Sequence, residues 1–290
     1  MERFGSPEAV VCAAREELEA CGILNETQIR HLLRQRERLE ELERWVDELT
    51  FDGVDVLTIE DDRYPPMLRT IPSAPPLIYV RGTIEPGDDR AVAVVGTRSP
   101  TAAGLELARE LAAALAEHGV TVVSGLALGI DGAAHRGALD AGGRTIAVLG
   151  SGIARIHPPE HEELAEEVAA SGALLTELHP RARANVSNLM ARNRLQVALS
   201  RAVLVVQTGL SGGTMTTVDF ARKFGRPVFA VASEEECPQT QGPRRLIREG
   251  ALPLRGVGDL DIVLERIDNW RPPVLNNNEE QGQGGQLTLL

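Results

Sequence analysis

Two short apolar runs joined by a helical pattern constrain the fold of this chain more than any other feature. Ala91–Val95 and Val120–Val123 are predominantly apolar, which is typical of strands buried on both faces of a sheet. Between them, from Gly104 onward, apolar residues recur at the spacing of one helix face. Two parallel strands joined through a helix form a right-handed crossover, so we expect a parallel sheet covered by helices.

The same alternation continues along the chain. Further strands are predicted at Thr145–Leu149, Ala173–Thr176, Ala202–Val206 and Pro227–Val231, and helices from about Ala133 and at Glu160–Ala170, Met190–Ser200, Thr214–Phe224, Pro243–Glu249 and Leu260–Arg266. Regular alternation of strand and helix predicts an α/β fold with a doubly wound, mostly parallel sheet.

Composition shifts divide the chain into four parts. Residues 1–50 have a charged, helical pattern, and residues 51–89 form a proline-punctuated connector with short strands. The α/β domain is expected at 90–270. Residues 271–290 are rich in Asn, Gln, Glu and Gly and are expected to form a flexible tail.

Charge and cysteine usage limit the classes of function. The net charge is −12, so any nucleic-acid site must be a local basic patch rather than a global field. The three cysteines have no metal-ligand spacing, and we expect no metal site. Without an N-terminal signal pattern or a long apolar run, we expect a cytoplasmic protein that does not enter the membrane.

Three loops rich in glycine and hydroxyl side chains follow predicted strands. The first loop is Gly96–Thr101, the second is Ser124–Asp131 and the third is Gln207–Thr217. All should lie at the carboxyl edge of the sheet, where open parallel sheets bind ligands and free helix amides favour phosphate. None matches G-x-G-x-x-G or a Walker loop, which disfavours a dinucleotide or triphosphate enzyme. The alternative is a set of plain turns, with Thr101 capping a helix.

The densest basic feature of the domain is Arg192-Asn193-Arg194. Residues two apart on a helix point roughly 200° from each other, so one arginine could meet a phosphate while the other braces a loop. Asp131 and His135 lie four residues apart and could line a ligand, although a structural role is the favoured interpretation. No catalytic set emerges, and we expect neither enzymatic activity nor a cofactor.

Ordered motifs across much of the chain resemble the DNA-processing protein A family, also called DprA or Smf. The match runs from about Asp61 to Ala251 and includes Asp62-Arg63-Tyr64-Pro65, Val94-Val95-Gly96-Thr97-Arg98, Ser124-Gly125-Leu126-Ala127, Arg192-Asn193-Arg194, Ser211-Gly212 and Gly225-Arg226. The resemblance implies an extended Rossmann-like fold, a homodimer, and single-stranded DNA bound in a basic pocket and delivered to the RecA recombinase in natural transformation and homologous recombination.

On this basis we predict a DNA phosphate site in the three loops and the basic run. Its members are Gly96, Thr97, Arg98, Ser99, Ser124, Gly125, Arg192, Asn193, Arg194, Ser211, Gly212, Gly213 and Thr214. The chain departs from the family where Leu189-Met190 replaces Phe-Pro and where Gln207 replaces a glutamate, and no winged-helix domain follows Trp270, so we expect a divergent member. The alternative is a Rossmann-like nucleotide-ligand sensor or a phosphoribohydrolase-like enzyme.

The last five residues form a separate motif. Gln286, Leu287, Thr288, Leu289 and Leu290 resemble the short peptide by which DNA replication and repair proteins dock on the sliding clamp. A terminal peptide on a polar tether suits such docking. The alternative is a terminus without a partner.

Overall fold

The computed structural model describes residues 4–272, so the predicted clamp-binding peptide Gln286–Leu290 lies outside the described residues. The chain forms two compact units, the first ending at Val54 and the second beginning at Asp55. No helix within residues 4–272 is long and apolar enough to span a bilayer.

The first unit consists of four helices, α1 (Pro7–Cys12), α2 (Arg15–Ala20), α3 (Glu26–Arg36) and α4 (Leu39–Phe51). Asn25 caps α3 by accepting from the Gln28 amide, and Gln28 reciprocates with the Asn25 amide. Leu18 and Ile29 are the centre of a small buried cluster. The first three helices therefore pack around a core of their own.

The second unit is built on one nine-stranded sheet. Its strands are β1 (Val54–Thr58), β2 (Leu77–Gly82), β3 (Ala91–Val95), β4 (Thr121–Ser124), β5 (Thr145–Val148), β6 (Ala173–Thr176), β7 (Ala202–Val205), β8 (Val228–Val231) and β9 (Leu252–Leu254). They lie in the order β1-β2-β6-β5-β4-β3-β7-β8-β9. The strands from β6 to β9 in this order are mutually parallel, and β2 pairs antiparallel with β6. The predicted Rossmann-like, mostly parallel fold is confirmed.

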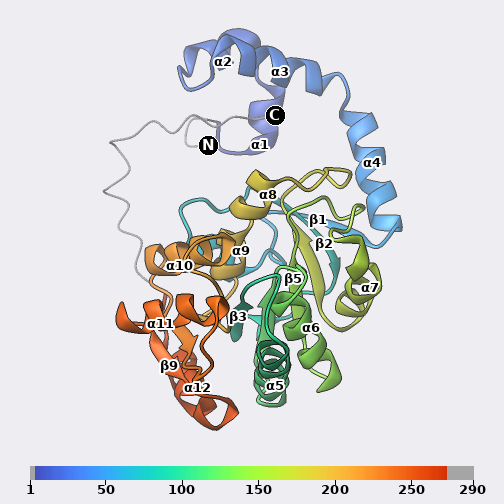
Figure 1. Cartoon of the computed structure of the whole chain (residues 1–290). Helices are drawn as coiled ribbons and strands as arrows, with labels where there is room; N and C mark the ends of the chain where they lie inside the picture. The colour runs from blue at the N-terminus through green and yellow to red at the C-terminus, as the bar shows by residue number, and fades with distance from the viewer. Residues whose placement is uncertain (1–3, 273–290) are drawn as a thin grey trace. The chain divides into compact units, whose positions relative to one another are not determined.

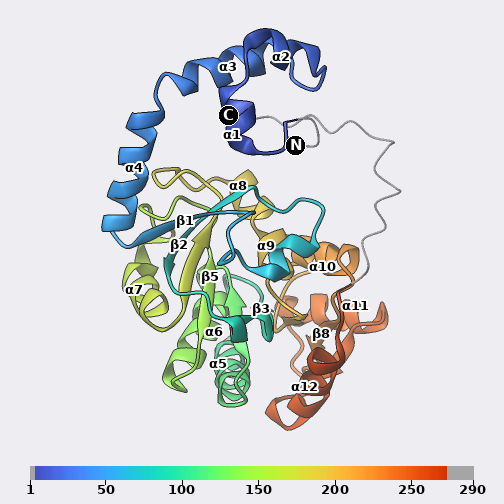
Figure 2. The same cartoon turned by 180° about the vertical axis from the view of Figure 1, so that it is seen from behind.

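Helices cover both faces of this sheet (Figures 1 and 2). They are α5 (Ala102–Glu117), α6 (Ile130–Asp140), α7 (Glu162–Ser171), α8 (Val186–Ala191), α9 (Asn193–Ala198), α10 (Gly213–Lys223), α11 (Gln241–Arg248) and α12 (Leu260–Asn269), with short 3-10 helices η1 (Pro66–Thr70), η2 (Pro86–Asp89), η3 (Pro159–His161), η4 (Pro238–Thr240) and η5 (Val257–Asp259). Alternate residues of β3 divide between two cores: Ala93 and Val95 pack with α9, α10 and α11, whereas Val92 and Val94 pack with α5, α6 and α12.

Three local differences from the expected elements have physical causes. The helix expected from about Ala133 begins at Ile130, because Gly129 adopts φ +81° and lets the chain turn into α6 earlier. The single helix expected over 190–200 is two helices, α8 and α9, which meet at Arg192. The strand β9, with Pro253 at its middle, is too short to show a period in the sequence.

A buried carboxylate ties η2 to the amino ends of β4 and β5. Asp88 is 5% exposed and accepts hydrogen bonds from Arg144 Nε (2.9 Å), Arg144 Nη2 (2.8 Å) and the Thr121 hydroxyl (2.7 Å). Burial by itself would raise the pKa of the Asp88 carboxyl, but these hydrogen bonds and that from the Glu85 amide hold this pKa below its ordinary value.

We expect Asp88→Asn to lower the free energy of unfolding by about 2 kcal/mol at neutral pH, because charge-assisted hydrogen bonds to a buried group are lost. Since the folded-state pKa of Asp88 is depressed, its contribution is complete above the unfolded-state pKa. It disappears as the pH falls through the folded-state pKa. Urea denaturation of both proteins from neutral to acidic pH measures this difference.

Glu85→Gln is the matched control, since Glu85 contacts the same arginine at 3.0 Å from an exposed position. Its substitution should change stability by at most about 0.5 kcal/mol. A stability difference between wild type and Asp88→Asn that stayed constant down to low pH would contradict the role of the charged carboxylate.

Candidate nucleic-acid interface

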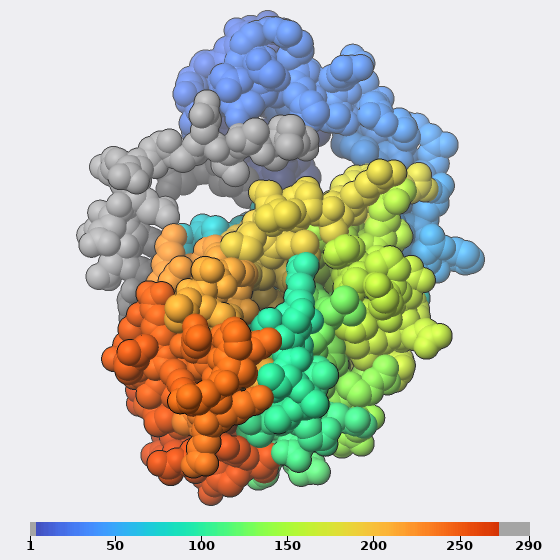
Figure 3. All heavy atoms as spheres, viewed as in Figure 1, coloured from blue at the N-terminus to red at the C-terminus, as the bar shows by residue number. Residues whose placement is uncertain are grey.

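A pocket of about 430 Å³ opens at the carboxyl edge of the sheet where the strand order reverses. From β3 the chain proceeds to β4 on one side and later returns through β7 on the other. The loops after β3 and β7 diverge here and leave a crevice, as expected at a topological switch point. Figure 3 shows the surface near residue 100 (teal) between the α10–α11 region (orange) and the α8 region (yellow). We call this pocket the groove.

Backbone contacts hold the three loops together. The Thr97 amide donates to the Gln207 carbonyl (2.7 Å), and the Ile130 amide donates to the Thr97 carbonyl (3.2 Å). A Cβ atom on Gly129 would come within 2.5 Å of the Thr97 carbonyl oxygen, so this position requires glycine for close approach as well as for its φ. The loops after β3, β4 and β7 therefore form one connected rim.

The groove gathers most of the predicted site residues but not all of them. Gly96, Thr97, Arg98, Arg192, Asn193, Ser211, Gly212, Gly213 and Thr214 line it. Ser99, Ser124, Gly125 and Arg194 lie outside the lining. Ser124 is fully buried and donates its hydroxyl hydrogen bond to the Val94 carbonyl (2.7 Å), which leaves its side chain inside the fold.

The amino end of α10 is open toward the groove. Gly212 precedes it with φ +119°, and no side chain of the described part of the chain caps the helix. Ser211, Gly212 and Gly213 are exposed, and the amides of Gly213 and Thr214 donate no hydrogen bond within residues 4–272. Asn193 Nδ2 donates to the Gly213 carbonyl (3.1 Å) and fixes this end of the helix. Free, fixed amides at a helix start are suited to binding an anion.

The amino end of α5, by contrast, is occupied by the protein itself. Gln207 Oε1 accepts from the Thr101 amide (3.0 Å), and Gln207 Nε2 donates to the Thr101 hydroxyl (2.9 Å). That hydroxyl also contacts Glu235 Oε2 (3.1 Å), and a Cβ on Gly104 would overlap the Gln207 amide. The helix start that receives a pyrophosphate in dinucleotide-binding folds is thus filled here by an amide and a carboxylate.

Arg98 supplies an exposed cation to the groove. Its side chain forms no ion pair or hydrogen bond within residues 4–272. It lies close enough to Arg192 that its charge contributes to lowering the pKa of that guanidinium. An unpaired arginine beside free helix amides favours binding of phosphate.

Arg192 lies at the floor of the groove and is 5% exposed. Its Nη1 donates to the Val148 carbonyl (2.7 Å), and a Cβ atom on Gly125 would overlap the same nitrogen. With its amide oriented to satisfy its neighbours, Gln196 accepts from the Gly125 amide (2.8 Å) and from Arg192 Nη1 (3.3 Å). Arg192 therefore connects the second loop to β5 and to the α8–α9 junction.

Asp131 balances the buried charge of Arg192. Asp131 is 7% exposed, lines the groove and accepts from the Gly125 amide (3.1 Å). Burial raises the pKa of the Asp131 carboxyl, and the charge of Arg192 counteracts this effect. Burial lowers the pKa of Arg192 to about 10, against the stabilising charge of Asp131, so the guanidinium remains charged at neutral pH.

Arg194 points away from the groove and forms an ion pair with Glu177. Its Nη1 and Nη2 contact the two carboxylate oxygens at 2.7 and 2.6 Å. The break between α8 and α9 at Arg192 separates the two arginines, with one in the groove and the other bracing the loop after β6. Glu177 therefore supports the fold around the groove.

His135 is fully buried beneath the second loop. The Thr145 hydroxyl donates to the Val122 carbonyl (2.8 Å), so it accepts from His135 Nδ1 at 2.7 Å. Burial, with the nearby charges of His161 and Arg192, lowers the pKa of His135 to about 3, and the ring is neutral at physiological pH. His135 does not line the groove, whereas Asp131 does.

An apolar wall completes the groove, and the sequence pattern did not reveal it. Val186, Leu189 and Met190 of α8 line one side, and Val186 is 78% exposed. Thr208 and Thr217 also line the groove; they belong to the third loop but were not among the predicted site residues, whereas Gln196 carried no sequence signal as a site residue. The sequence feature that pointed to this wall was the departure from the family pattern at Leu189-Met190, where the family usually has Phe-Pro.

Within residues 4–272 no cluster of three His, Cys, Asp or Glu could hold a metal ion.

We expect Gly125→Ala to displace the Arg192 guanidinium and to lower the free energy of unfolding by about 1–3 kcal/mol, because the well-packed site has no room for a methyl group. Gly87→Ala is the control, since an added Cβ there meets nothing within 4 Å. Urea denaturation measures both changes. Equal, small effects of the two substitutions would contradict the packing of Arg192 against Gly125.

Comparison with known proteins gives a consistent result. Residues 55–265 match the family described as DNA recombination-mediator protein A. The chain is 36% identical over 257 residues to Protein Smf of Synechocystis, an alignment that covers 87% of this chain and 63% of that protein. The chain thus spans less than two thirds of the length of this curated relative.

Solved structures show the same architecture. The X-ray structure of DNA processing protein A from Streptococcus pneumoniae has a TM-score of 0.76 and 28% identity, with 86% of each chain covered. A structure of the Helicobacter pylori protein, described as showing its single-stranded DNA binding mode, has a TM-score of 0.65 and 27% identity and covers 74% of this chain and 97% of that one. The family match over most of the chain and the shared fold lead to one conclusion: this chain belongs to the DNA recombination-mediator protein A family.

Proposed function

We propose that the groove binds single-stranded DNA through its phosphates and that the protein protects the strand and delivers it to the RecA recombinase. The observation that carries the proposal is the meeting of unpaired Arg98 with the free amides of Gly213 and Thr214 in one groove. The Helicobacter pylori relative, whose structure concerns single-stranded DNA binding, supports the same ligand.

The shape of the site favours a strand over a dinucleotide. The start of α5 is closed by Gln207 and Glu235, whereas the start of α10 is open. The open, mixed polar and apolar groove offers phosphate contacts on one side and the apolar wall of Val186, Leu189 and Met190 on the other. Such a site suits a backbone phosphate with a neighbouring base packed on aliphatic side chains.

The charge balance makes Arg98 the main electrostatic determinant. The chain carries a net charge of −12, so binding of a polyanion depends on local cations. The charge of buried Arg192 is offset by Asp131, whereas exposed Arg98 has no carboxylate partner within residues 4–272. Arg98 should therefore dominate phosphate binding, and Arg192 should position the loops.

Arg98→Ala should raise the Kd for an oligo-dT strand about tenfold and reduce the magnitude of its salt slope by about 1, because one phosphate contact is lost. Fluorescence anisotropy over a range of salt concentrations measures both quantities. Lys223→Ala removes an equal charge from the opposite end of α10 and is the matched control. Identical effects of the two substitutions would reject the assignment of the groove.

The alternative of a nucleotide sensor or phosphoribohydrolase-like enzyme makes a different prediction in a paired screen. Thermal stabilisation by mononucleotides but not by oligo-dT would favour the alternative. Salt-sensitive stabilisation by oligo-dT would favour the proposed function.

The partners implied by the family resemblance extend this proposal. They are RecA and a second copy of the chain in a homodimer; the sliding clamp is a further proposed partner, on the separate resemblance of Gln286–Leu290 to clamp-docking peptides. Deleting Gln286–Leu290 should abolish capture of the clamp in a pull-down and leave oligo-dT binding unchanged. Undiminished capture of the clamp by the shortened chain would exclude this peptide as the docking element.

A further inference from the structure

A second basic hollow lies at the edge of the sheet opposite the groove. It has a volume of about 440 Å³ and adjoins Pro227, which immediately precedes β8. Arg226, Arg266 and Arg271 line it together with Trp270. Three arginines and a tryptophan in one hollow are notable in a protein with a net charge of −12.

Arg226 places a buried positive charge beside this hollow. It is 3% exposed and donates from Nη2 to the Thr70 hydroxyl (2.9 Å) and the Ala198 carbonyl (3.4 Å), while its Nε has no hydrogen-bond partner within residues 4–272. Burial lowers its pKa to about 10, so it stays charged at neutral pH. No carboxylate within the described residues pairs with it. A buried cation balanced only by neutral dipoles attracts an anion.

Trp270 is fixed over that charge. The Arg226 Cζ atom lies 4.0 Å from the centroid of the Trp270 ring, and Trp270 Nε1 donates to the Gly225 carbonyl (3.1 Å). The ring is nevertheless half-buried and lines the hollow. A partly exposed indole held in one orientation is a suitable surface for stacking a planar group.

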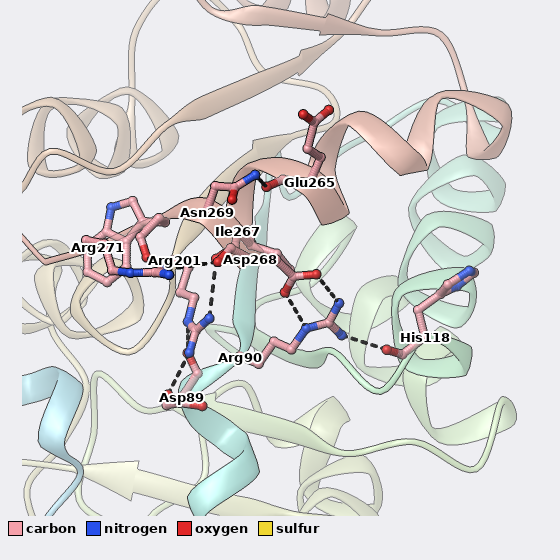
Figure 4. A network of polar contacts seen from close by, with 10 residues as sticks. Asp89, Arg90, His118, Arg201, Glu265, Ile267, Asp268, Asn269 and Arg271 are labelled. Atoms are coloured by element: carbon pink, nitrogen blue, oxygen red, sulfur yellow. Dashed lines mark hydrogen bonds and ion pairs between the residues drawn. The ribbon is translucent and has the colours of Figure 1, made fainter.

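The exposed arginines of the hollow, Arg266 and Arg271, pair with no carboxylate of residues 4–272. Arg271 donates only to the carbonyls of Asp268 (3.0 Å) and Trp270 (2.8 Å), and Arg266 forms no ion pair within residues 4–272. Asp268 is engaged by Arg90 through two contacts of 2.7 and 3.0 Å. Figure 4 shows this pair, and the Glu265 carboxylate directed away from Arg271. The guanidinium groups of Arg266 and Arg271 are thus available to a ligand.

We propose that this hollow is a second ligand site that takes a nucleotide, with the phosphate on Arg266 and Arg271 and the base against Trp270. Guanidinium groups bind phosphate through paired hydrogen bonds, and indole rings stack on bases irrespective of sequence. The nucleotide could be free or part of a strand, and both present the same chemistry. The site is separate from the groove and does not depend on its proposed function.

Trp270 provides its own reporter, because the sequence contains only two tryptophans, Trp45 and Trp270. In the full chain carrying Trp45→Phe, titration with dTMP or with oligo-dT should quench the remaining fluorescence in a saturable way. Adding Arg266→Ala and Arg271→Ala should raise the Kd about tenfold or more, as charge-assisted contacts are lost. Quenching by dTMP would identify a free nucleotide as a ligand, and quenching by oligo-dT alone would identify a strand.

Two controls separate this site from the groove and from misfolding. Arg98→Ala should leave quenching by dTMP unchanged, and Arg255→Ala should behave like the parent, since Arg255 is an exposed arginine outside both sites. Unchanged circular dichroism and melting temperature would verify that the double variant is folded. Absence of quenching by both ligands, or quenching that the double substitution does not weaken, would overturn the proposal.

Discussion

The burial of the Arg192 guanidinium is the interaction on which the architecture of the groove depends. A charged group that is 5% exposed depends on the fold for hydrogen-bond acceptors and for an opposite charge, and of its donors Nε has no acceptor within residues 4–272. The Val148 carbonyl and the Gln196 amide supply acceptors, Asp131 supplies the opposite charge, and Gly125 supplies the space. These groups come from different loops and helices, so one side chain fixes the relative positions of β5, the second loop and the α8–α9 junction.

The helix starts of α5 and α10 differ in whether side chains within residues 4–272 already occupy them. At α5, Gln207 uses both ends of its amide, accepting from the Thr101 amide and donating to the Thr101 hydroxyl. An ionised glutamate at this position could accept a hydrogen bond from the Thr101 amide but could not donate one to the Thr101 hydroxyl. The departure from the family pattern at Gln207 therefore allows a second hydrogen bond to Thr101. At α10 the residue before the helix is a glycine, and the amides of Gly213 and Thr214 have no acceptor among residues 4–272. Among the helix starts of α5 and α10, it is therefore the start of α10 that presents unpartnered amides to the groove, as far as residues 4–272 show.

The sequence anticipated the elements that a periodic pattern specifies. Ala91–Val95 and Ala173–Thr176 are strands over the expected residues, because short, predominantly apolar runs followed by turn residues are typical of strands buried on both faces. The glycine- and hydroxyl-rich loops could also be placed, since they follow those strands directly. The division between α8 and α9 could not be predicted, because the helical period continues across Arg192 and only tertiary contacts break it. The apolar wall of α8 was missed for a similar reason. The sequence of a short helix does not show whether its aliphatic side chains will contact the core or line a groove.

By itself, the sequence determined the α/β class, the carboxyl-edge location of three loops and the family resemblance, because these depend on local periodicity and on ordered motifs. The tertiary structure alone decided the different environments of three arginines. Arg98 is exposed, Arg192 is buried against Val148, and Arg194 is paired with Glu177. The tertiary structure also brought Arg226 under Trp270, residues 44 positions apart in the chain. Charge and hydrogen-bonding capacity are properties of the residue type, but whether they serve the fold or remain available to a ligand depends on neighbours that only the folded chain brings together.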